Sequence, residues 1–280
     1  MGKSILGRRG NNMIKNRIEI DNKTTMNRLS CSYSYMDKEK LVEVVRNNPD
    51  LKYIQLSKNL PEDALTAIDS VLEIRPDLIF RIYGMYNDAP FDLARLSGMS
   101  NIRNLRLDML KKPDYSRFGN IDQLSKLKKI SNLYLDIFGN VNMRFLNDLR
   151  EIYLLYLLIE SGSPQIDKSF WEDTTLKNIE LGNKAVEYAK LIKTKDNDRI
   201  NRLVLFQTTI NDISFINHLK INELRFINCR IKKQAISDAV NSVDNLVLAN
   251  CKYDTGFINS FIGLNSIKIV DKESDIVLDK

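Results

Sequence analysis

The chain has 280 residues, of which 43% are hydrophobic and 28% are charged, and this is the composition of a folded protein. Its longest apolar run, Ile152 to Ile159, has eight residues and is far too short to cross a bilayer as a helix. The chain shows no secretory signal, and its three cysteines do not make a disulfide framework. We therefore expect a cytoplasmic protein, although secretion by a route that needs no signal peptide stays open.

The net charge of +6 is concentrated at the start of the chain. Residues 1–28 hold seven basic and two acidic residues, whereas the rest of the chain holds 35 basic and 34 acidic ones. A nucleic-acid reader is expected to carry a basic face on its folded body, so this distribution argues against nucleic acid as the partner. We divide the chain into a basic leader, 1–28, partly disordered or forming a capping strand at Ile18 and Ile20, and a repeat domain, 29–280.

Strands and helices alternate at the start of the repeat domain. Residues 29–33 have the alternation of a strand, with Leu29 and Cys31 on one face. A helix is expected over 37–46, because Asp37 is placed to cap it. A second helix is expected after Pro61, because proline and acidic residues suit a first turn.

A six-position unit then recurs along the chain: an apolar residue, two variable ones, an apolar residue, one variable one and another apolar residue. The nine matches are Leu51-x-x-Ile54-x-Leu56, Ile102-x-x-Leu105-x-Leu107, Ile130-x-x-Leu133-x-Leu135, Leu149-x-x-Ile152-x-Leu154, Leu176-x-x-Ile179-x-Leu181, Ile200-x-x-Leu203-x-Leu205, Ile221-x-x-Leu224-x-Phe226, Val243-x-x-Leu246-x-Leu248 and Leu264-x-x-Ile267-x-Ile269. From Leu105 on, the fourth positions are 28, 19, 27, 24, 21, 22 and 21 residues apart. The first step, from Ile54 to Leu105, is 51 residues, so we expect a hidden strand over 77–82 with Phe80 and Ile82 pointing inward.

Alternation places the fourth and sixth positions on one face of a short strand and the third, fifth and seventh on the other. A single strand of this kind cannot bury its apolar face, but stacked repeats build a continuous core behind a parallel sheet. Asn59, Cys229 and Cys251 stand three places after the sixth position. In these features residues 29–270 resemble the leucine-rich-repeat family. The resemblance implies an α/β solenoid shaped as a curved horseshoe, with about eleven short parallel strands on the concave face and helices and loops on the convex face.

The return segments between the strands are expected to be helical over 184–193 and 232–243. In the stretches 107–130 and 156–176 the pattern is looser and predicts longer loops or short helical turns.

A reactive constellation is not found in the sequence. His218 is the only histidine, and we expect it to be a partly buried scaffold residue. Cys229 and Cys251 are 22 residues apart because the repeat has that length, which favours a structural role over metal binding. Cys31 is expected to pack within its strand. The sequence therefore predicts a protein that is not an enzyme and has no metal, cofactor or membrane anchor.

The candidate working surface is the concave face, where the third, fifth and seventh positions of successive repeats align. On it we expect an exposed aromatic and apolar strip flanked by charged residues, and tyrosine and arginine are frequent in the energetic centres of protein interfaces. The candidate partner-binding residues are Tyr53, Arg106, Asp108, Tyr134, Asp136, Glu151, Tyr153, Leu155, Glu180, Arg202, Phe206 and Arg225. The alternative without a binding role is a solvated face whose aromatic side chains stabilise the sheet by cross-strand pairing. Trp171 is a second candidate contact, unless it anchors its loop to the core.

These features favour a module that binds another protein. The expected roles are an inhibitor or immunity protein that blocks a toxin or effector, or an effector that grips a host protein. An adaptor for a ubiquitin-type or signalling enzyme is the alternative, although residues 1–28 are too short for a recruiting module. Nucleic-acid binding through the basic leader and an enzyme with an unrecognised site are the weaker hypotheses.

Overall fold

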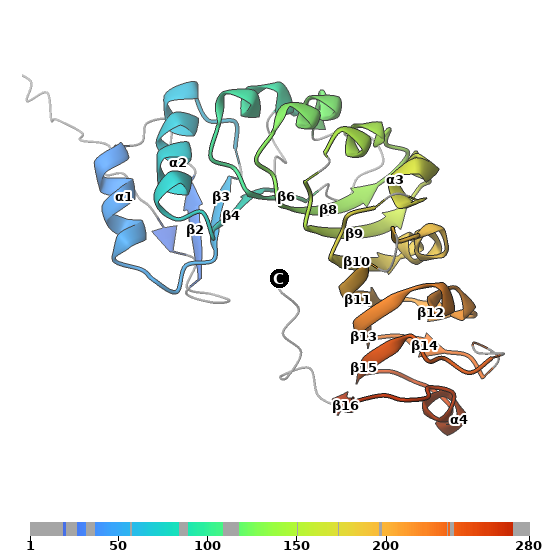
Figure 1. Cartoon of the computed structure of the whole chain (residues 1–280). Helices are drawn as coiled ribbons and strands as arrows, with labels where there is room; N and C mark the ends of the chain where they lie inside the picture. Colours follow the sequence, from blue (N-terminus) through green and yellow to red (C-terminus); the bar gives the residue numbers. More distant parts are fainter. Residues whose placement is uncertain are drawn as a thin grey trace, which may run out of the picture.

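The computed structural model is an arc of parallel strands with helices along its outer side (Figure 1). It describes residues 19–20, 27–31, 37–56, 58–83, 89–108, 118–149, 151–172, 174–195, 198–233, 235 and 238–270. Residues 1–18, including Ile18, lie outside this described part.

One twelve-stranded sheet runs through the described part of the chain. In sheet order its strands are β1 (Glu19–Ile20), β2 (Arg28–Cys31), β3 (Tyr53–Leu56), β4 (Ile79–Ile82), β6 (Asn104–Asp108), β8 (Asn132–Phe138), β9 (Leu154–Ser161), β10 (Asn178–Asn183), β11 (Arg199–Phe206), β13 (Lys220–Ile227), β15 (Val243–Ala249) and β16 (Ser266–Val270). β1 pairs antiparallel with β2, and every later pair is parallel. The eleven parallel strands predicted from the repeats are therefore confirmed, and the architecture is a leucine-rich-repeat solenoid.

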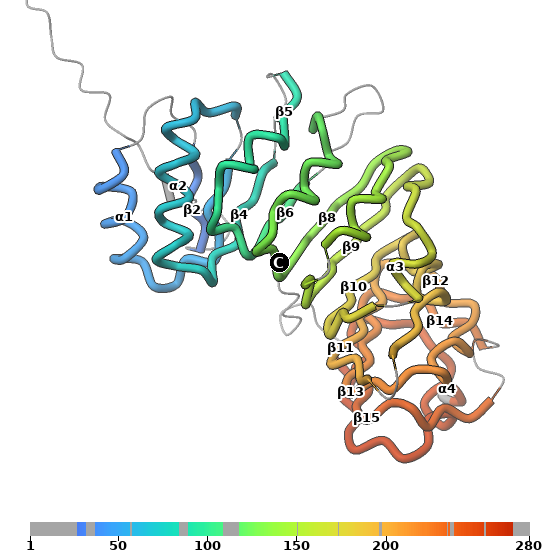
Figure 2. The backbone as a smooth tube through the Cα atoms, turned by 45° about the horizontal axis from the view of Figure 1, so that its top comes forward, coloured from blue at the N-terminus to red at the C-terminus, as the bar shows by residue number. Residues whose placement is uncertain are grey.

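The helices and short strand pairs form the convex layer (Figure 2). The α-helices are α1 (Lys38–Arg46), α2 (Glu62–Ile74), α3 (Lys168–Glu172) and α4 (Thr255–Asn259). The 3-10 helices are η1 (Leu93–Gly98), η2 (Ile121–Lys126), η3 (Arg144–Asp148), η4 (Lys184–Leu191) and η5 (Ser214–His218). Two small parallel sheets complete the layer: β5 (Phe91–Asp92) with β7 (Phe118–Gly119), and β12 (Thr209–Ile210) with β14 (Arg230–Ile231).

The first two helices form where the sequence predicts them. The Asp37 carboxylate accepts hydrogen bonds from the backbone N–H groups of Glu39 and Lys40, so it caps α1. Pro61 precedes α2, and six apolar side chains of this helix are buried in the main core. The hidden strand is β4, in which Phe80 and Ile82 are fully buried.

The helix predicted over 232–243 is wrong for the described residues of that segment. They contain a turn and an isolated bridge between Val240 and Phe261 instead. The fourth positions of the strands on either side of the segment, Leu224 and Leu246, are only 22 residues apart. A strand, two turns and a full α-helix do not fit into that length.

The repeat at β9 has a different register from the one predicted. β9 pairs Leu155 with Leu133 on one side and with Ile179 on the other, so the true unit is Ile152-x-x-Leu155-x-Leu157. The correction of three residues turns the irregular steps of 19 and 27 residues into 22 and 24. Residues 152–159 are apolar at every position, so alternation does not define their register and the pairing with β8 and β10 decides it.

In two repeats the residue three places after the sixth position ties the repeat to its neighbour. The Cys229 thiol donates to the Leu205 carbonyl at 3.3 Å, and the Cys251 thiol donates to the Phe226 carbonyl at 3.2 Å. Both acceptors are sixth positions of the preceding repeat. The cysteines thus satisfy backbone carbonyls where the chain leaves the sheet, in agreement with the structural role predicted for them.

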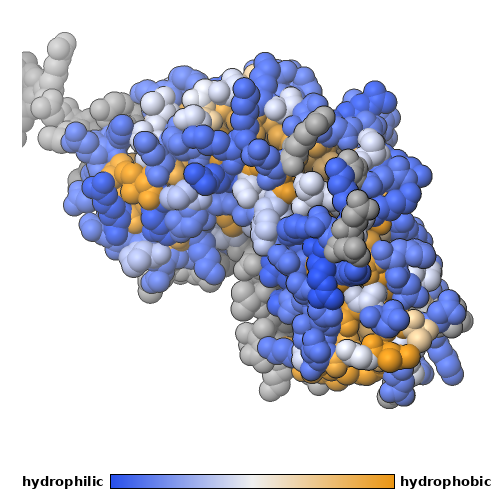
Figure 3. All heavy atoms as spheres, viewed as in Figure 1, coloured by the Kyte–Doolittle hydropathy of each residue, from blue (hydrophilic) through white to orange (hydrophobic). Residues whose placement is uncertain are grey.

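The two ends of the sheet differ. β1 pairs with the outer edge of β2, whereas β16 has a partner on one side only among the described strands. The inward-pointing Ile267 and Ile269 of β16 are therefore 45% and 49% exposed. Figure 3 shows hydrophobic atoms gathered at this lower end of the arc.

Candidate functional site

The concave face is the candidate site, because the parallel register brings polar and aromatic side chains of many repeats together there. Reading the fifth positions along the sheet gives Gln55, Arg81, Arg106, Tyr134, Tyr156, Glu180, Val204, Arg225, Val247 and Lys268. Arginine and tyrosine thus gather on β4 to β9. Tyr156 replaces Tyr153 at this position because of the register correction.

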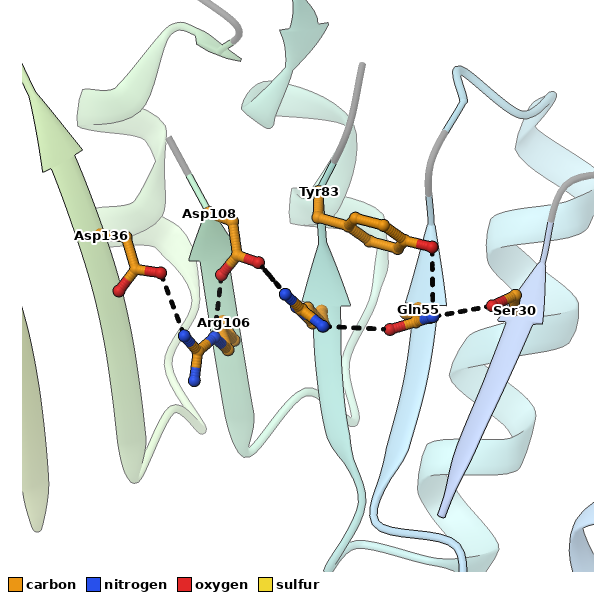
Figure 4. A network of polar contacts seen from close by, with 7 residues as sticks. Ser30, Gln55, Tyr83, Arg106, Asp108 and Asp136 are labelled. Carbon is orange, nitrogen blue, oxygen red and sulfur yellow. Dashed lines mark hydrogen bonds and ion pairs between the residues drawn. The ribbon is translucent and has the colours of Figure 1, made fainter. Parts of the chain in front are cut away.

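A chain of polar contacts crosses the first half of this face (Figure 4). Gln55 Nε2 donates to Ser30 Oγ at 2.7 Å, and Arg81 Nη1 donates to Gln55 Oε1 at 3.4 Å. Arg81 Nε donates to Asp108 Oδ2 at 2.7 Å, and Arg106 Nε donates to Asp108 Oδ1 at 2.8 Å. We call these residues, with Asp136, the ion-pair ladder. It links five neighbouring strands, β2 to β8, and fixes the side-chain conformations of two arginines.

The carboxylates of the ladder differ in their electrostatics. Burial by itself would raise the pKa of Asp108, but Arg106 and Arg81 outweigh burial and hold the pKa below its ordinary value. Arg106 Nη2 also donates to Asp136 Oδ2 at 3.0 Å, while Asp136 Oδ1 is shielded from solvent and has no hydrogen-bond partner in the part of the chain that the structure describes. Burial, together with the nearby Asp108, raises the pKa of Asp136 to about 6 despite the attraction of Arg106.

The aromatic side chains form a packed cluster in the middle of the concave face. Tyr134 and Tyr156 have ring centroids 6.0 Å apart, and Tyr156 stacks on Phe206 at 5.2 Å. The residues of this concave aromatic cluster are Tyr134, Leu154, Tyr156, Leu158, Val204, Phe206, Ile227, Ala249 and Val270. The prediction of an exposed strip is therefore wrong, since Tyr134 and Phe206 are 5% and 1% exposed.

Gly182 explains the burial of Phe206. It pairs with Phe206 across β10 and β11 and has no side chain, so the phenyl ring lies over its Cα. A Cβ built on Gly182 would lie 2.2 Å from Phe206 Cε2 and 2.8 Å from Leu158 Cδ1. The ring thereby extends across β10 to Tyr156. The sequence pattern does not indicate this contact.

The remaining predicted residues fall into three groups. Arg202 is paired with Glu180 at 3.1 Å, and Arg225 is paired with Glu223 at 2.8 Å, all on the concave face. Leu155 was predicted to be exposed, which is wrong, because the register correction places it in the main core with no exposed surface.

Glu151 and Tyr153 precede β9 and are exposed. The Tyr153 hydroxyl accepts a hydrogen bond from Asn201 Nδ2 at 3.0 Å, at the edge where the strands begin. These two residues are not among the paired concave positions of β9. The signal that could have corrected them was the 19-residue step, which is short for a repeat of this kind.

A hollow of about 270 Å³ opens on the concave face beside the ion-pair ladder. Its lining residues are Arg28, Tyr53, Arg81, Arg106, Asp136, Tyr156, Leu158, Glu160, Phe206 and Gln207. They come from β2 at one side and from β9 and β11 at the other, because the curvature of the sheet turns these strands toward one another. We call this space the arginine hollow. Arg28, Tyr156 and Glu160 were not among the predicted site residues.

Three other residues that the sequence analysis singled out are scaffold residues or surface residues. Trp171 lies in α3 with no exposed surface and stacks on Tyr188 at 5.6 Å, so it anchors α3 to the core. His218 is exposed at the end of η5, so the prediction of a partly buried histidine is wrong. Cys31 is buried in β2, as expected.

The described residues contain no group of three or more His, Cys, Asp or Glu side chains that could hold a metal ion. Across the same part of the chain, no helix has the length and apolar character needed to cross a membrane.

No protein-family model matches the chain, and no curated protein matches it. Among solved structures it is similar to the crystal structure of an internalin from Listeria monocytogenes, with a TM-score of 0.37 and 15% identity over 81% of this chain and 70% of that one. A likeness at this level carries no argument about function. The repeat architecture therefore rests on the strand order and register of this chain itself.

Proposed function

We propose that the chain is a non-catalytic module that binds another protein on its concave face. The observation that carries the proposal is the ion-pair ladder beside the concave aromatic cluster. Arginine and tyrosine contribute much of the binding energy at protein interfaces. Side chains already held by cross-strand contacts lose little conformational entropy when a partner binds, so a fixed surface of this kind favours association.

The role that fits such a module is an inhibitor or immunity-type protein, or an effector, that grips a toxin, effector or host protein. An adaptor that presents a client to a ubiquitin-type or signalling enzyme is the second candidate. We propose a cytoplasmic location for the chain and assign it no cofactor.

The test is to use the tagged full chain to capture partners from lysate of its source and to compare two double variants. The concave variant is Arg202→Ala with Arg225→Ala. The control is Lys128→Ala with Lys129→Ala, two exposed residues in the turn between η2 and β8.

We expect the concave variant to lose at least about tenfold of the affinity for the captured partner, as charged hot-spot residues do. The control should keep the wild-type affinity, measured by calorimetry with the purified partner. Equal affinity of both variants, with intact circular dichroism, would show that the concave face is not the interface.

A further inference from the structure

Of the concave arginines that the structure describes, Arg28 has a distinct environment. Arg81 and Arg106 are paired with Asp108 or Asp136, and the two arginines farther along the face are paired with glutamates. Arg28 has no carboxylate partner in the described part of the chain. Its guanidinium lies 5.5 Å over the ring of Tyr53, and its Nε is shielded from solvent without an acceptor among the described residues. Within the described residues this cation therefore has no counter-charge of its own.

Tyr53 gives a second, independent indication that the arginine hollow receives an anion. The side chain is 2% exposed and lines the arginine hollow, yet its hydroxyl has no hydrogen-bond partner among the described residues. The hydroxyl oxygen itself is not among the polar atoms that are shielded from solvent without a partner, so it is accessible from the hollow. The charges that act on this phenol are those of Arg106, Arg28 and Arg81, followed by Asp108. A hydroxyl group so placed is suited to donate to an anion in the hollow.

Arg106 supplies a third donor. Its Nε and Nη2 are bonded to Asp108 and Asp136, and the remaining nitrogen is turned away from both carboxylates in Figure 4. Because Asp108 and Asp136 hold the other two nitrogens, the position of this group is fixed before any ligand arrives. Unused donors from β2, β3 and β6 thus line one hollow.

The size and charge of the hollow indicate which kind of ligand it suits. A volume of about 270 Å³ is just below the range of about 300–1,000 Å³ typical of small-molecule sites, and it suits one inserted side chain. Three arginines line the hollow against the two carboxylates of Asp136 and Glu160. Asp136 is already bonded to Arg106, and Glu160 stands on the β9 side, away from β2 and β3.

We propose that the arginine hollow binds the carboxylate of an Asp or Glu side chain of the partner protein, which accepts hydrogen bonds from Arg28, Tyr53 and Arg106. The inference rests on the proposed function and specifies its partner as one with an acidic anchor residue. Guanidinium groups suit this recognition because their fixed N–H donors match the geometry of a carboxylate.

The test uses the full chain, labelled with ¹⁵N, and blocked peptides at low ionic strength. The probes are acetyl-Gly-Gly-Glu-Gly-Gly-amide, its Gln counterpart and inorganic phosphate, and the readout is the shift of the arginine Nε–H signals. We expect the Glu peptide to bind at least about tenfold more tightly than the Gln peptide, because the charge strengthens every hydrogen bond to the guanidinium groups.

Three variants assign the binding to the hollow. Arg28→Gln should weaken binding of the Glu peptide by about tenfold or more, and Tyr53→Phe, which keeps the ring and removes one donor, by about threefold to tenfold. Arg225→Gln is the matched control, since Arg225 is a concave arginine outside the hollow, and it should bind as wild type does.

The inference is overturned if the Glu and Gln peptides bind equally, or if folded Arg28→Gln and Tyr53→Phe both bind as wild type does. Binding of phosphate at Arg28 without binding of the Glu peptide would overturn it too, in favour of a phosphorylated ligand. If the peptide fails to bind while Arg202→Ala with Arg225→Ala still loses the captured partner, the concave interface stands and only the acidic anchor is rejected.

Discussion

The contact between Gly182 and Phe206 gives a sharp test of how the concave face is packed. In Gly182→Ala the new Cβ would lie 2.2 and 2.3 Å from two carbons of the phenyl ring, whereas carbon atoms in contact are about 3.5–4.0 Å apart. The ring must therefore move by more than about 1 Å. It is 1% exposed and stacked on Tyr156, so it has little free space in which to move.

The expected magnitude follows from the cost of overpacking. We expect Gly182→Ala to lower the free energy of unfolding by about 1–3 kcal/mol. In a Phe206→Ala background the main obstacle is gone, and only the end of the Leu158 side chain, 2.8 Å from the new Cβ, must shift. The same substitution should then raise the free energy of unfolding by up to about 0.4–1 kcal/mol, because alanine restricts the unfolded chain. The backbone of Gly182 does not have a positive φ, so an alanine is tolerated there.

The assay is equilibrium unfolding in urea of the wild type, both single variants and the double variant. Emission of the only tryptophan, Trp171, serves as the signal together with circular dichroism. The coupling between the two substitutions should be about 1.5–4 kcal/mol, well above the scatter of about 0.5 kcal/mol for independent sites. Gly119→Ala is the control, since a Cβ there meets no atom within 4 Å and should change stability little. Equal effects of Gly182→Ala in both backgrounds would refute the placement of the ring.

Three further predictions concern other parts of the fold. Burial raises the pKa of Asp136 to about 6, above its ordinary value of about 3.9. The folded state therefore favours the protonated carboxyl group of Asp136. The stability that this preference contributes is complete below the ordinary pKa and is lost as pH rises through 6. Wild type should gain stability relative to Asp136→Asn when urea unfolding is measured at pH 5 instead of pH 7, and parallel curves would contradict this. Trp171→Ala should lower the free energy of unfolding by about 3–5 kcal/mol, whereas Phe170→Ala, at a half-buried neighbour, should cost clearly less. Both are measured by urea unfolding followed by circular dichroism alone, because the first variant removes the only tryptophan; equal losses would speak against the anchoring role. Ile267→Asn, on the exposed last strand, should change thermal stability little, but Leu246→Asn at the equivalent, fully buried position of β15 should unfold that end of the solenoid; a large loss from the first substitution would mean that Ile267 is covered in solution.

The sequence by itself determines the architecture of this protein. Every repeat must bury its fourth and sixth residues, and an isolated strand has nothing to bury them against, so the recurrence of the pattern predicts stacking and a parallel sheet. The same reasoning locates β4, because the 51-residue gap leaves room for one more repeat. Local capping residues such as Asp37 and Pro61 suffice to place α1 and α2.

Only the tertiary structure determines which side chains line the concave face and which of them are buried. In residues 152–159 both faces are apolar, so pairing with β8 and β10 sets the register, exchanging Tyr153 for Tyr156 and moving Leu155 into the core. Phe206 is buried because a glycine 24 residues earlier in the chain lies beside it, which no local pattern reveals. Arg28 has its particular environment because the curvature of the sheet turns β2 toward β9 and β11 around one hollow. Burial and charge at these positions depend on neighbours from other repeats, whereas the sequence pattern reports only what each strand must bury.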